Sequence, residues 1–261
     1  MTDLSPLGRI VRQHDPDRFF TALFAPPDRR ETLFLLYAVN HELARAREVV
    51  SNPMLALIRL QWWREVAKGA RRRHEVAGPL GEALDDGRLR PADILEMIEG
   101  REAETEPVED LAAFRAYVRA AFGGVAAAAG SALGADGLAL DVLRDLGAAY
   151  GVAGILRSVP MLARQDRCVL PLDVLRSAGL SKADLGSAAV PAAFAPVQAA
   201  LAGIGREWLE DGSRTRLPRA VVAAALPGVL ARYDLRYPGR YRPRGVAVRV
   251  AVAVAAASRR I

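Results

Sequence analysis

The stretch PMLALIRLQWWREVAKGA, residues 53–70, shows the pattern that decides the fold and recurs along the chain. It opens on a proline, which is favoured at the first position of a helix, and continues in residues of high helix propensity. Four of its apolar side chains fall within about 80° of one another on a helical projection, namely Leu55, Ile58, Trp62 and Val66. The stretch therefore predicts an amphipathic helix that packs through this stripe. Because Trp62 and Trp63 are adjacent, we expect one to point into the core and the other to meet a neighbouring helix.

Outward from this stretch, helical signals dominate and strand signals are scarce. Prolines open several further stretches of apolar and charged residues, and no long alternating pattern rich in Val or Ile supports a sheet. The one ambiguous segment is the Val–Ala alternation at 246–256, which we assign to a helix because other strands are lacking. No linker or internal repeat divides the chain. The sequence predicts a single all-α domain over residues 1–261, with helices at roughly 16–24, 27–50, 53–70, 79–86, 91–104, 108–133, 137–163, 191–211, 217–233 and 245–257.

The composition is typical of a globular protein in a reducing compartment. Apolar residues make up 51% and charged residues 25% of the 261 residues, which is an ordinary balance. Cys168 is the only cysteine, so the chain has no internal disulfide framework. No segment reaches the ~20 apolar residues of a membrane span, and the N-terminus lacks an apolar stretch of signal-peptide length. We therefore expect a cytoplasmic location.

The net charge of +6 comes almost entirely from arginine, since Lys68 and Lys182 are the only lysines. Arginine that is abundant along the whole chain, together with Ala and Gly, is a weak signal for nucleic acid, which we do not expect as a partner. A modest attraction to anionic surfaces remains, including the inner face of a membrane.

Histidines and common catalytic motifs give little indication of a site. His14, His41 and His74 are the only histidines, and none has a partner at the spacing of a zinc site. The chain contains no phosphate-binding glycine loop, no dinucleotide fingerprint and no nucleophile elbow.

Three stretches between about residues 15 and 175 carry a more specific pattern. They are FFTALF at 19–24 with Pro27, Arg30 and LYA at 36–38; LQWWRE at 60–65; and LGAA at 146–149 with ILRSV at 155–159, Arg167 and LP at 170–171. In this order and spacing they resemble the squalene/phytoene synthase family. The resemblance implies an isoprenoid-synthase-like helical barrel around a central cavity, in which two prenyl diphosphates are joined. It also implies two aspartate-rich motifs that hold Mg²⁺, an ion that prefers oxygen ligands.

The chain departs from the family at those motifs. On the first motif helix, the stripe expected to face the cavity reads Tyr37, His41, Ala44 and Glu48. In the second motif the corresponding positions are Gly154, Arg157, Ser158 and Met161. Of five acidic groups that the resemblance implies, Glu48 alone is retained, so we expect no metal site and assign no catalytic residue. The resemblance still assigns substrate contact to Arg30, Arg157 and Arg167.

Two functions compete. The degraded motifs resemble the branch of the family represented by the mitochondrial complex I assembly factor, which predicts a non-catalytic scaffold with a prenyl-shaped cavity. Its expected partners are other proteins or a prenyl lipid, and it needs no cofactor. The alternative is an active isoprenoid transferase that uses Mg²⁺ at a divergent site, built from Glu42, Glu48, Glu99 and Glu102.

The C-terminal tail, residues 233–261, is basic and then apolar. The segment from Arg232 to Arg244 alternates arginines with tyrosines and leads into the apolar residues 246–257. A packed linker, a protein contact and a peripheral contact with an anionic inner membrane are all compatible with this pattern, and nucleic acid is the least favoured.

Overall fold

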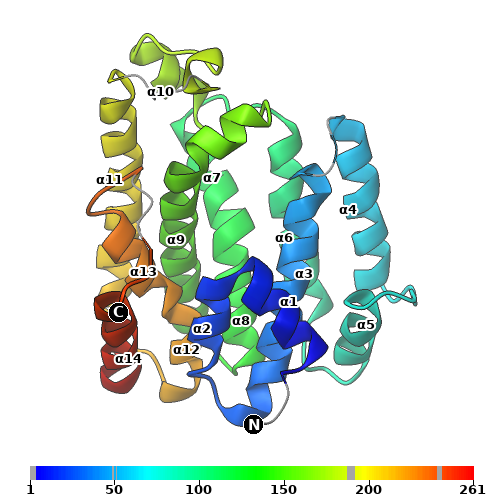
Figure 1. The fold of residues 1–261 in the computed structure, drawn as a ribbon. Helices are drawn as coiled ribbons and strands as arrows, with labels where there is room; N and C mark the ends of the chain where they lie inside the picture. The colour runs from blue at the N-terminus through cyan, green and yellow to red at the C-terminus, as the bar shows by residue number, and fades with distance from the viewer. Residues whose placement is uncertain (1–3, 49, 51, 187–191, 240–242) are drawn as a thin grey trace.

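A computed structural model describes residues 4–48, 50, 52–186, 192–239 and 243–261. All regular elements in these ranges are helical, which confirms the all-α prediction (Figure 1). The α-helices are α1 (Pro6–His14), α2 (Pro16–Ala22), α3 (Arg30–Glu48), α4 (Pro53–Ala67), α5 (Ala77–Asp85), α6 (Pro91–Glu102), α7 (Leu111–Val118), α8 (Gly124–Ala132), α9 (Gly137–Arg164), α10 (Leu172–Ser177), α11 (Phe194–Ser213), α12 (Val222–Ala225), α13 (Pro227–Asp234) and α14 (Val246–Ser258). Short 3₁₀ segments are η1 (Pro27–Arg29), η2 (Ala103–Thr105), η4 (Ala183–Gly186) and η5 (Arg219–Val221), and η3 (Arg119–Gly123) is a π-helical segment between α7 and α8.

Each predicted range falls on one or more helices, but the sequence reading missed α1 and α10. The start of α1 did carry a signal, because Pro6 is its first residue and the Ser5 hydroxyl accepts a hydrogen bond from the Gly8 amide at 2.9 Å. The predicted helix at 137–163 corresponds to α9, which continues through Pro160.

Helix α9 is the centre of the core and packs against α8, α11, α13 and the π-helical segment η3. Close contact is possible because α9 carries glycine where these neighbours approach. A Cβ atom on Gly147 would lie 2.5 Å from the Ala126 Cβ, and one on Gly151 would lie 2.5 Å from the Phe122 ring. By length and composition α9 is also the one described helix able to cross a membrane, yet 67% of its apolar window is buried inside the fold.

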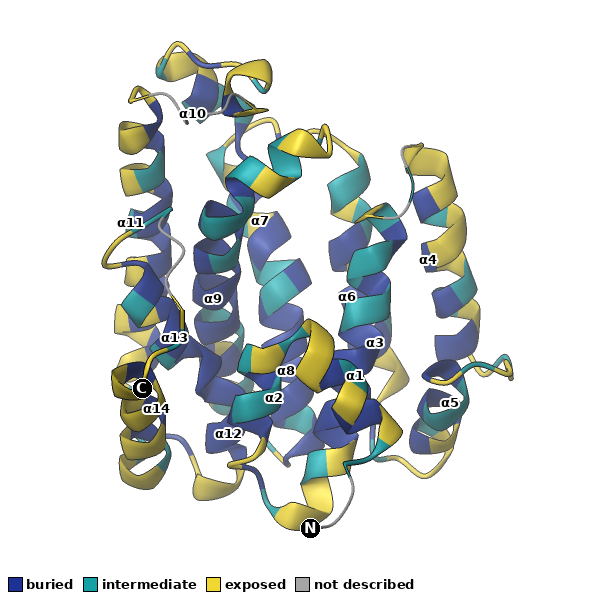
Figure 2. Cartoon of the chain, in the orientation of Figure 1, coloured by how far each residue is buried: buried dark blue, intermediate teal, exposed yellow. Residues whose placement is uncertain are grey.

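The packing stripe predicted for α4 is wrong at Leu55 and Ile58, although Val66 is buried. The helix is buried through a different face, formed by Ala56, Leu60, Trp63, Val66 and Ala67. Leu55 and Ile58 are 48% and 59% exposed, and Figure 2 shows α4 at one side of the molecule with an exposed outer face. Both faces of α4 are apolar in sequence, so periodicity alone does not tell which one meets α3 and α6.

The adjacent tryptophans divide as expected. Trp63 is buried and Trp62 is half-buried, with their rings edge to face at 5.0 Å. Both rings also meet the edge of His74, whose Nδ1 accepts hydrogen bonds from backbone amides at the start of α5.

In the C-terminal tail, α14 packs on the core through Val248, Val252 and Ala255. Its opposite face carries the exposed side chains of Val246, Val250 and Val254. Three residues of the predicted basic segment, 240–242, lie outside the described part of the chain.

Candidate functional site

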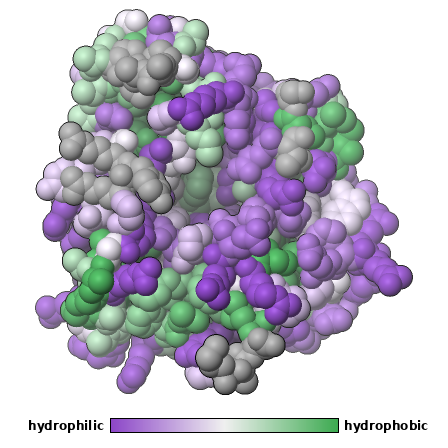
Figure 3. Space-filling view, in the orientation of Figure 1, coloured by the Kyte–Doolittle hydropathy of each residue, from purple (hydrophilic) through white to green (hydrophobic). Residues whose placement is uncertain are grey.

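A cavity of about 610 Å³ lies among α1, α2, the end of α3, the C-terminal half of α9 and the residues that follow it. This is the size of a small-molecule site. The face shown in Figure 3 is hollowed near its centre, within a largely hydrophilic rim. The cavity wall includes seven of the residues singled out from the sequence, namely Ala44, Glu48, Gly154, Arg157, Ser158, Met161 and Arg167.

Three other predicted residues do not reach the cavity wall. Tyr37 is fully buried beneath Arg18, and burial raises the pKa of its phenol to about 12. His41 stacks on His14, with ring centroids 4.1 Å apart. Arg30 donates from Nε to the Ala25 carbonyl at 3.0 Å. The prediction that these side chains face the cavity is wrong because α1 and α2 lie against α3. Only the C-terminal part of the predicted stripe on α3, from Ala44 to Glu48, borders the cavity.

Glu104 is the centre of a buried ion cluster on one side of the cavity, which we call the Arg167 cluster. Its carboxylate is 3% exposed and accepts from Arg101 Nη1 at 2.6 Å, Arg167 Nη2 at 2.9 Å and the Tyr117 hydroxyl at 3.0 Å. Burial raises the pKa of Tyr117 well above its ordinary value, so the hydroxyl remains a donor. Glu48 stands at the edge of this cluster, with Oε1 4.0 Å from Arg167 Nη1.

Arg244 is the centre of a second cluster, on the side formed by α2 and α13, which we call the Arg244 cluster. Its guanidinium binds Asp17 and Asp234, each at 2.7 Å. Asp234 also accepts from Arg157 at 2.5 Å, and Asp17 accepts from the Tyr150 hydroxyl at 3.2 Å. Burial acts against the charge of Arg244, but the hydrogen bonds to the two aspartates raise its pKa. Arg244 is thus part of the cavity wall and not a free surface charge of the tail.

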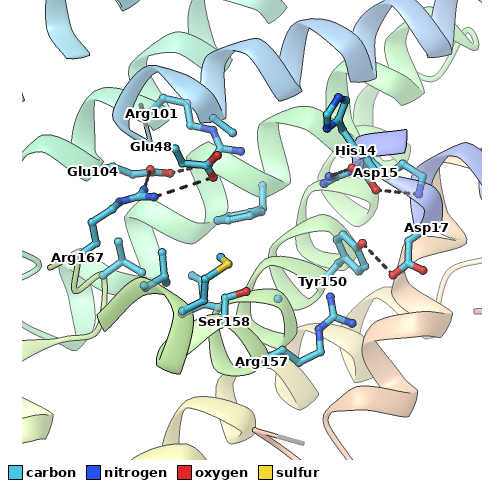
Figure 4. Close-up of a pocket in the computed structure, with 18 of the residues that line it drawn as sticks. His14, Asp15, Asp17, Glu48, Arg101, Glu104, Tyr150, Arg157, Ser158 and Arg167 are labelled. Carbon is cyan, nitrogen blue, oxygen red and sulfur yellow. Dashed lines mark hydrogen bonds and ion pairs between the residues drawn. The ribbon is translucent and has the colours of Figure 1, made fainter. Parts of the chain in front are cut away.

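Asp15 and Arg18 complete this second side. Arg18 Nη1 binds the Asp15 carboxylate at 2.9 Å, and its guanidinium lies over the rings of Tyr37 and Tyr150. Figure 4 shows Arg101, Glu48, Glu104 and Arg167 gathered on one side of the cavity, and Asp15, Asp17, Tyr150 and Arg157 on the other, with Ser158 between.

The carboxylates of this cavity face arginines. Glu48 and Glu104, from different elements, converge on the guanidinium of Arg167, and Asp17 and Asp234 converge on that of Arg244. An arginine therefore stands between each pair, where a shared cation would otherwise balance their charge. Mg²⁺ needs oxygen lone pairs in near-octahedral geometry, and the carboxylates of Glu104, Asp17 and Asp234 already accept hydrogen bonds from arginine. Among the described residues, no group of three or more His, Cys, Asp and Glu is placed to hold a metal ion.

The divergent metal site considered from the sequence is not assembled either. Of its four glutamates, Glu48 alone lines the main cavity. Glu42 pairs with Arg45 at 3.3 Å and Glu102 pairs with Arg64 at 2.7 Å, while Glu99 is exposed on α6.

Sequence reasoning did not find the residues that make up most of the two clusters. Glu104 lies in an acidic stretch of the sequence that matches none of the motif positions. Asp17, Asp234 and Arg244 had no motif spacing to connect them, because they are 217 and 10 residues apart in the chain and meet only in the fold. An excess of arginine over lysine was the one general signal, since arginine forms forked pairs with carboxylates.

Comparison with known proteins identifies relatives over nearly the whole chain. The sequence model of the squalene/phytoene synthase family matches residues 11–251. The curated relatives include proteins named NADH dehydrogenase (ubiquinone) complex I, assembly factor 6, from Bos taurus and Homo sapiens, each 24% identical over 182 residues. A Drosophila melanogaster homolog of that factor is 26% identical over 188 residues. These matches cover 66–67% of this chain but only 55% of each relative, so the chain spans about half the length of the curated relatives it matches.

Solved structures share the fold. A crystal structure of a dehydrosqualene synthase with a ligand superposes with a TM-score of 0.80 at 14% identity, over 97% of this chain and 94% of that one. Squalene synthase HpnC from Alicyclobacillus acidocaldarius gives a TM-score of 0.66 at 16% identity, over 97% and 92%. At these identities the likeness establishes the isoprenoid-synthase-like fold that the sequence predicted, and the fold alone.

Proposed function

The chain belongs to the squalene/phytoene synthase family, and we propose that it is a non-catalytic member that acts as a scaffold in the assembly of a protein complex. The observation that carries the proposal is the pair of arginines between the cavity carboxylates, Arg167 between Glu48 and Glu104 and Arg244 between Asp17 and Asp234. An enzyme of this family uses carboxylates to hold the metal that binds a diphosphate, whereas the carboxylates of this cavity pair with arginines.

The role in assembly is supported by the relatives. Those with the matches reported above carry the name of a complex I assembly factor. By this comparison we infer that the partner is a protein, namely a subunit or early intermediate of a respiratory NADH dehydrogenase. In this proposal the cavity is a remnant of the enzyme fold, and its shape suits a prenyl lipid.

The first experiment tests the absence of metal chemistry. Titration calorimetry with farnesyl or geranylgeranyl diphosphate, with and without Mg²⁺, is expected to show no Mg²⁺-dependent binding. The reason is that the carboxylates of Glu104, Asp17 and Asp234 are held by arginines, so they are not free to hold Mg²⁺ for a diphosphate. A Mg²⁺-dependent affinity in the micromolar range would establish the transferase alternative.

The second experiment tests the role in cells. Deletion of the gene in its own organism is expected to reduce assembled NADH dehydrogenase on native gels without loss of an isoprenoid product. A copy with Glu48→Ala is expected to restore assembly, because Glu48 is only at the edge of the Arg167 cluster. If Glu48→Ala behaves like the deletion and an isoprenoid product disappears, the protein is an enzyme.

We further infer a peripheral contact with the inner membrane through α14. Its exposed face carries three valines and Arg249, and Arg236 is exposed nearby in the chain. Each arginine at an anionic surface contributes about 1 kcal/mol, and the small apolar side chains add a shallow anchor. Binding to anionic vesicles is expected at low salt and is expected to weaken as the screening length falls from ~10 Å at 0.1 M to ~3 Å at 1 M salt. Equal sedimentation with neutral vesicles would contradict this inference.

A further inference from the structure

One guanidinium nitrogen in the cavity lacks a hydrogen-bond acceptor among the described residues. This atom is Nη1 of Arg167, which is fully shielded from solvent in a side chain that is only 8% exposed. Oε1 of Glu48 is 4.0 Å away, which is too far for a hydrogen bond. Buried donors are nearly always satisfied. Arg167 lines the cavity, so a small turn of its side chain brings Nη1 to an acceptor that occupies the cavity.

The charges around this nitrogen indicate what that acceptor is. Arg101 and Arg167 carry two positive charges, and the buried Glu104 carboxylate supplies one negative charge between them. Glu48 is 43% exposed and not hydrogen-bonded to the cluster, so its charge is partly screened by water. On the other side of the cavity, Asp15, Asp17 and Asp234 balance Arg18, Arg157 and Arg244 one for one. The excess at the Arg167 cluster is therefore about one positive charge.

The rest of the cavity suits an apolar body. Between the two clusters the wall is lined by Phe122, Ile155, Met161, Leu162 and Val169. Gly154 opens this wall further, because a Cβ atom added to it would have no heavy atom within 4 Å. A ligand that occupies the cavity thus meets one charged donor and a mainly apolar surface.

We propose that the cavity binds an amphiphile with a single oxyanion head, which accepts a hydrogen bond from Arg167 Nη1, and with an apolar chain that lies along α9 beside Gly154. A single negative charge balances the cluster without metal, whereas a diphosphate brings more charge than it can neutralise. The inference rests on the proposed metal-free character of this site and does not depend on the role in assembly.

Myristate and tetradecyl phosphate are suitable probes, because they carry the same chain on the two common oxyanion heads. Tetradecanol supplies the chain without the charge. Titration calorimetry in EDTA is expected to show myristate binding about tenfold or more above tetradecanol, as a hydrogen bond to a charged group contributes that much. The comparison of myristate with tetradecyl phosphate then tells whether a carboxylate or a phosphate is the better head.

Variants separate the head from the chain. Arg167→Gln is expected to weaken myristate binding about tenfold or more and to leave tetradecanol unchanged. Glu48→Gln is expected to tighten myristate binding about two- to fivefold, because it removes a competing negative charge. Gly154→Leu is expected to abolish binding of all three probes. Gly203→Leu, at a glycine of α11 that is also open but outside the cavity, is the matched control.

The outcomes distinguish the inference from the proposed function. If Arg167→Gln does not fold, the binding of the probes to Glu48→Gln and Gly154→Leu still tests the inference. Equal binding of myristate and tetradecanol, or weaker binding in Glu48→Gln, overturns the inference. Failure of all three probes to bind overturns it as well and leaves the proposed function standing, whereas Mg²⁺-dependent binding of farnesyl diphosphate overturns both.

Discussion

The buried charges on the two sides of the cavity are balanced to different extents. In the Arg244 cluster, Asp17 and Asp234 share one arginine, each also accepts a second donor, and with Asp15 and Arg18 the charges balance. In the Arg167 cluster, two arginines share the single buried carboxylate of Glu104, and one guanidinium nitrogen remains without an acceptor. The first arrangement is complete as it stands. The second is arranged to receive one further acceptor.

This difference shows two ways in which arginine balances carboxylates in a cavity wall. Buried carboxylates without a counterion cost free energy in a low-dielectric interior. Here arginines supply the positive charge from within the chain.

The largest effect is expected at Glu104. Glu104→Gln keeps the size of the side chain but leaves Arg101 and Arg167 without their shared counterion in the interior. Loss of one partner of a buried ion pair costs about 3–5 kcal/mol, so the free energy of unfolding in urea is expected to fall by about that amount. Glu207→Gln, which breaks the surface pair with Arg115, is the control and is expected to cost less than about 1 kcal/mol. Similar losses in both variants would mean that the Arg167 cluster is effectively solvated.

A smaller loss is expected on the other side. Asp234→Asn removes one charge from the Arg244 cluster, but Arg244 keeps Asp17, and the asparagine can still accept a hydrogen bond. Arg157 also loses its charged partner, but its side chain is 20% exposed and reaches water, whereas Arg101 and Arg167 are each 8% exposed. We expect a decrease of about 1–3 kcal/mol in the free energy of unfolding, measured in the same urea titration as Glu104→Gln. A loss equal to or larger than that of Glu104→Gln would show that the balanced cluster has no redundancy.

Two glycines on α9 sharpen the contrast between the packed core and the open cavity. Gly151→Ala would place a methyl group 2.5 Å from the Phe122 ring and is expected to lower stability by about 1–3 kcal/mol. The methyl group added by Gly154→Ala would lie in open space. Because the substitution removes a glycine from a helix, it is expected to raise the free energy of unfolding by about 0.5–1 kcal/mol. Thermal melting of both variants measures the difference. Equal shifts of the same sign would contradict the placement of Gly154 on the cavity wall.

The smallest effect concerns pH at the stacked pair of His14 and His41. Burial, and then the nearby His14, lower the pKa of His41 below its ordinary value of 6.5. The unfolded chain therefore takes up the proton more readily than the folded protein, and stability is expected to decrease as the pH falls below about 6.5. Urea unfolding at about pH 7.5 and about pH 5 should show a smaller decrease in His41→Asn than in the unchanged protein. An unchanged pH dependence in the variant would place the proton uptake elsewhere.

The sequence was sufficient for the helical architecture and for part of the site. Prolines at helix starts and the absence of strand patterns predicted the helices, and the motif positions located Ala44, Glu48, Gly154, Ser158 and Arg167 on the cavity wall. The helices could be predicted because helix propensity is a local property, which acts over one or two turns.

Other features were decided only when the helices packed. Tyr37 and His41 share the motif stripe with Glu48, but α1 and α2 lie against that part of α3 and keep these two side chains off the cavity wall. Leu55 and Ile58 continue the apolar pattern of α4, yet the helix turns its other face inward.

The sequence by itself determined that this chain forms helices and that Glu48 is the one acidic residue at its motif positions. The tertiary structure alone decided how the cavity carboxylates are paired, because Asp17, Asp234 and Arg244 are distant or unpatterned in the chain and meet only in the folded cavity. The physical reason is that the free energy of a charge depends on its burial and on its neighbours in space. Neither can be read from local spacing, so Arg244, for which the sequence left several roles open, completes an ion cluster in the fold.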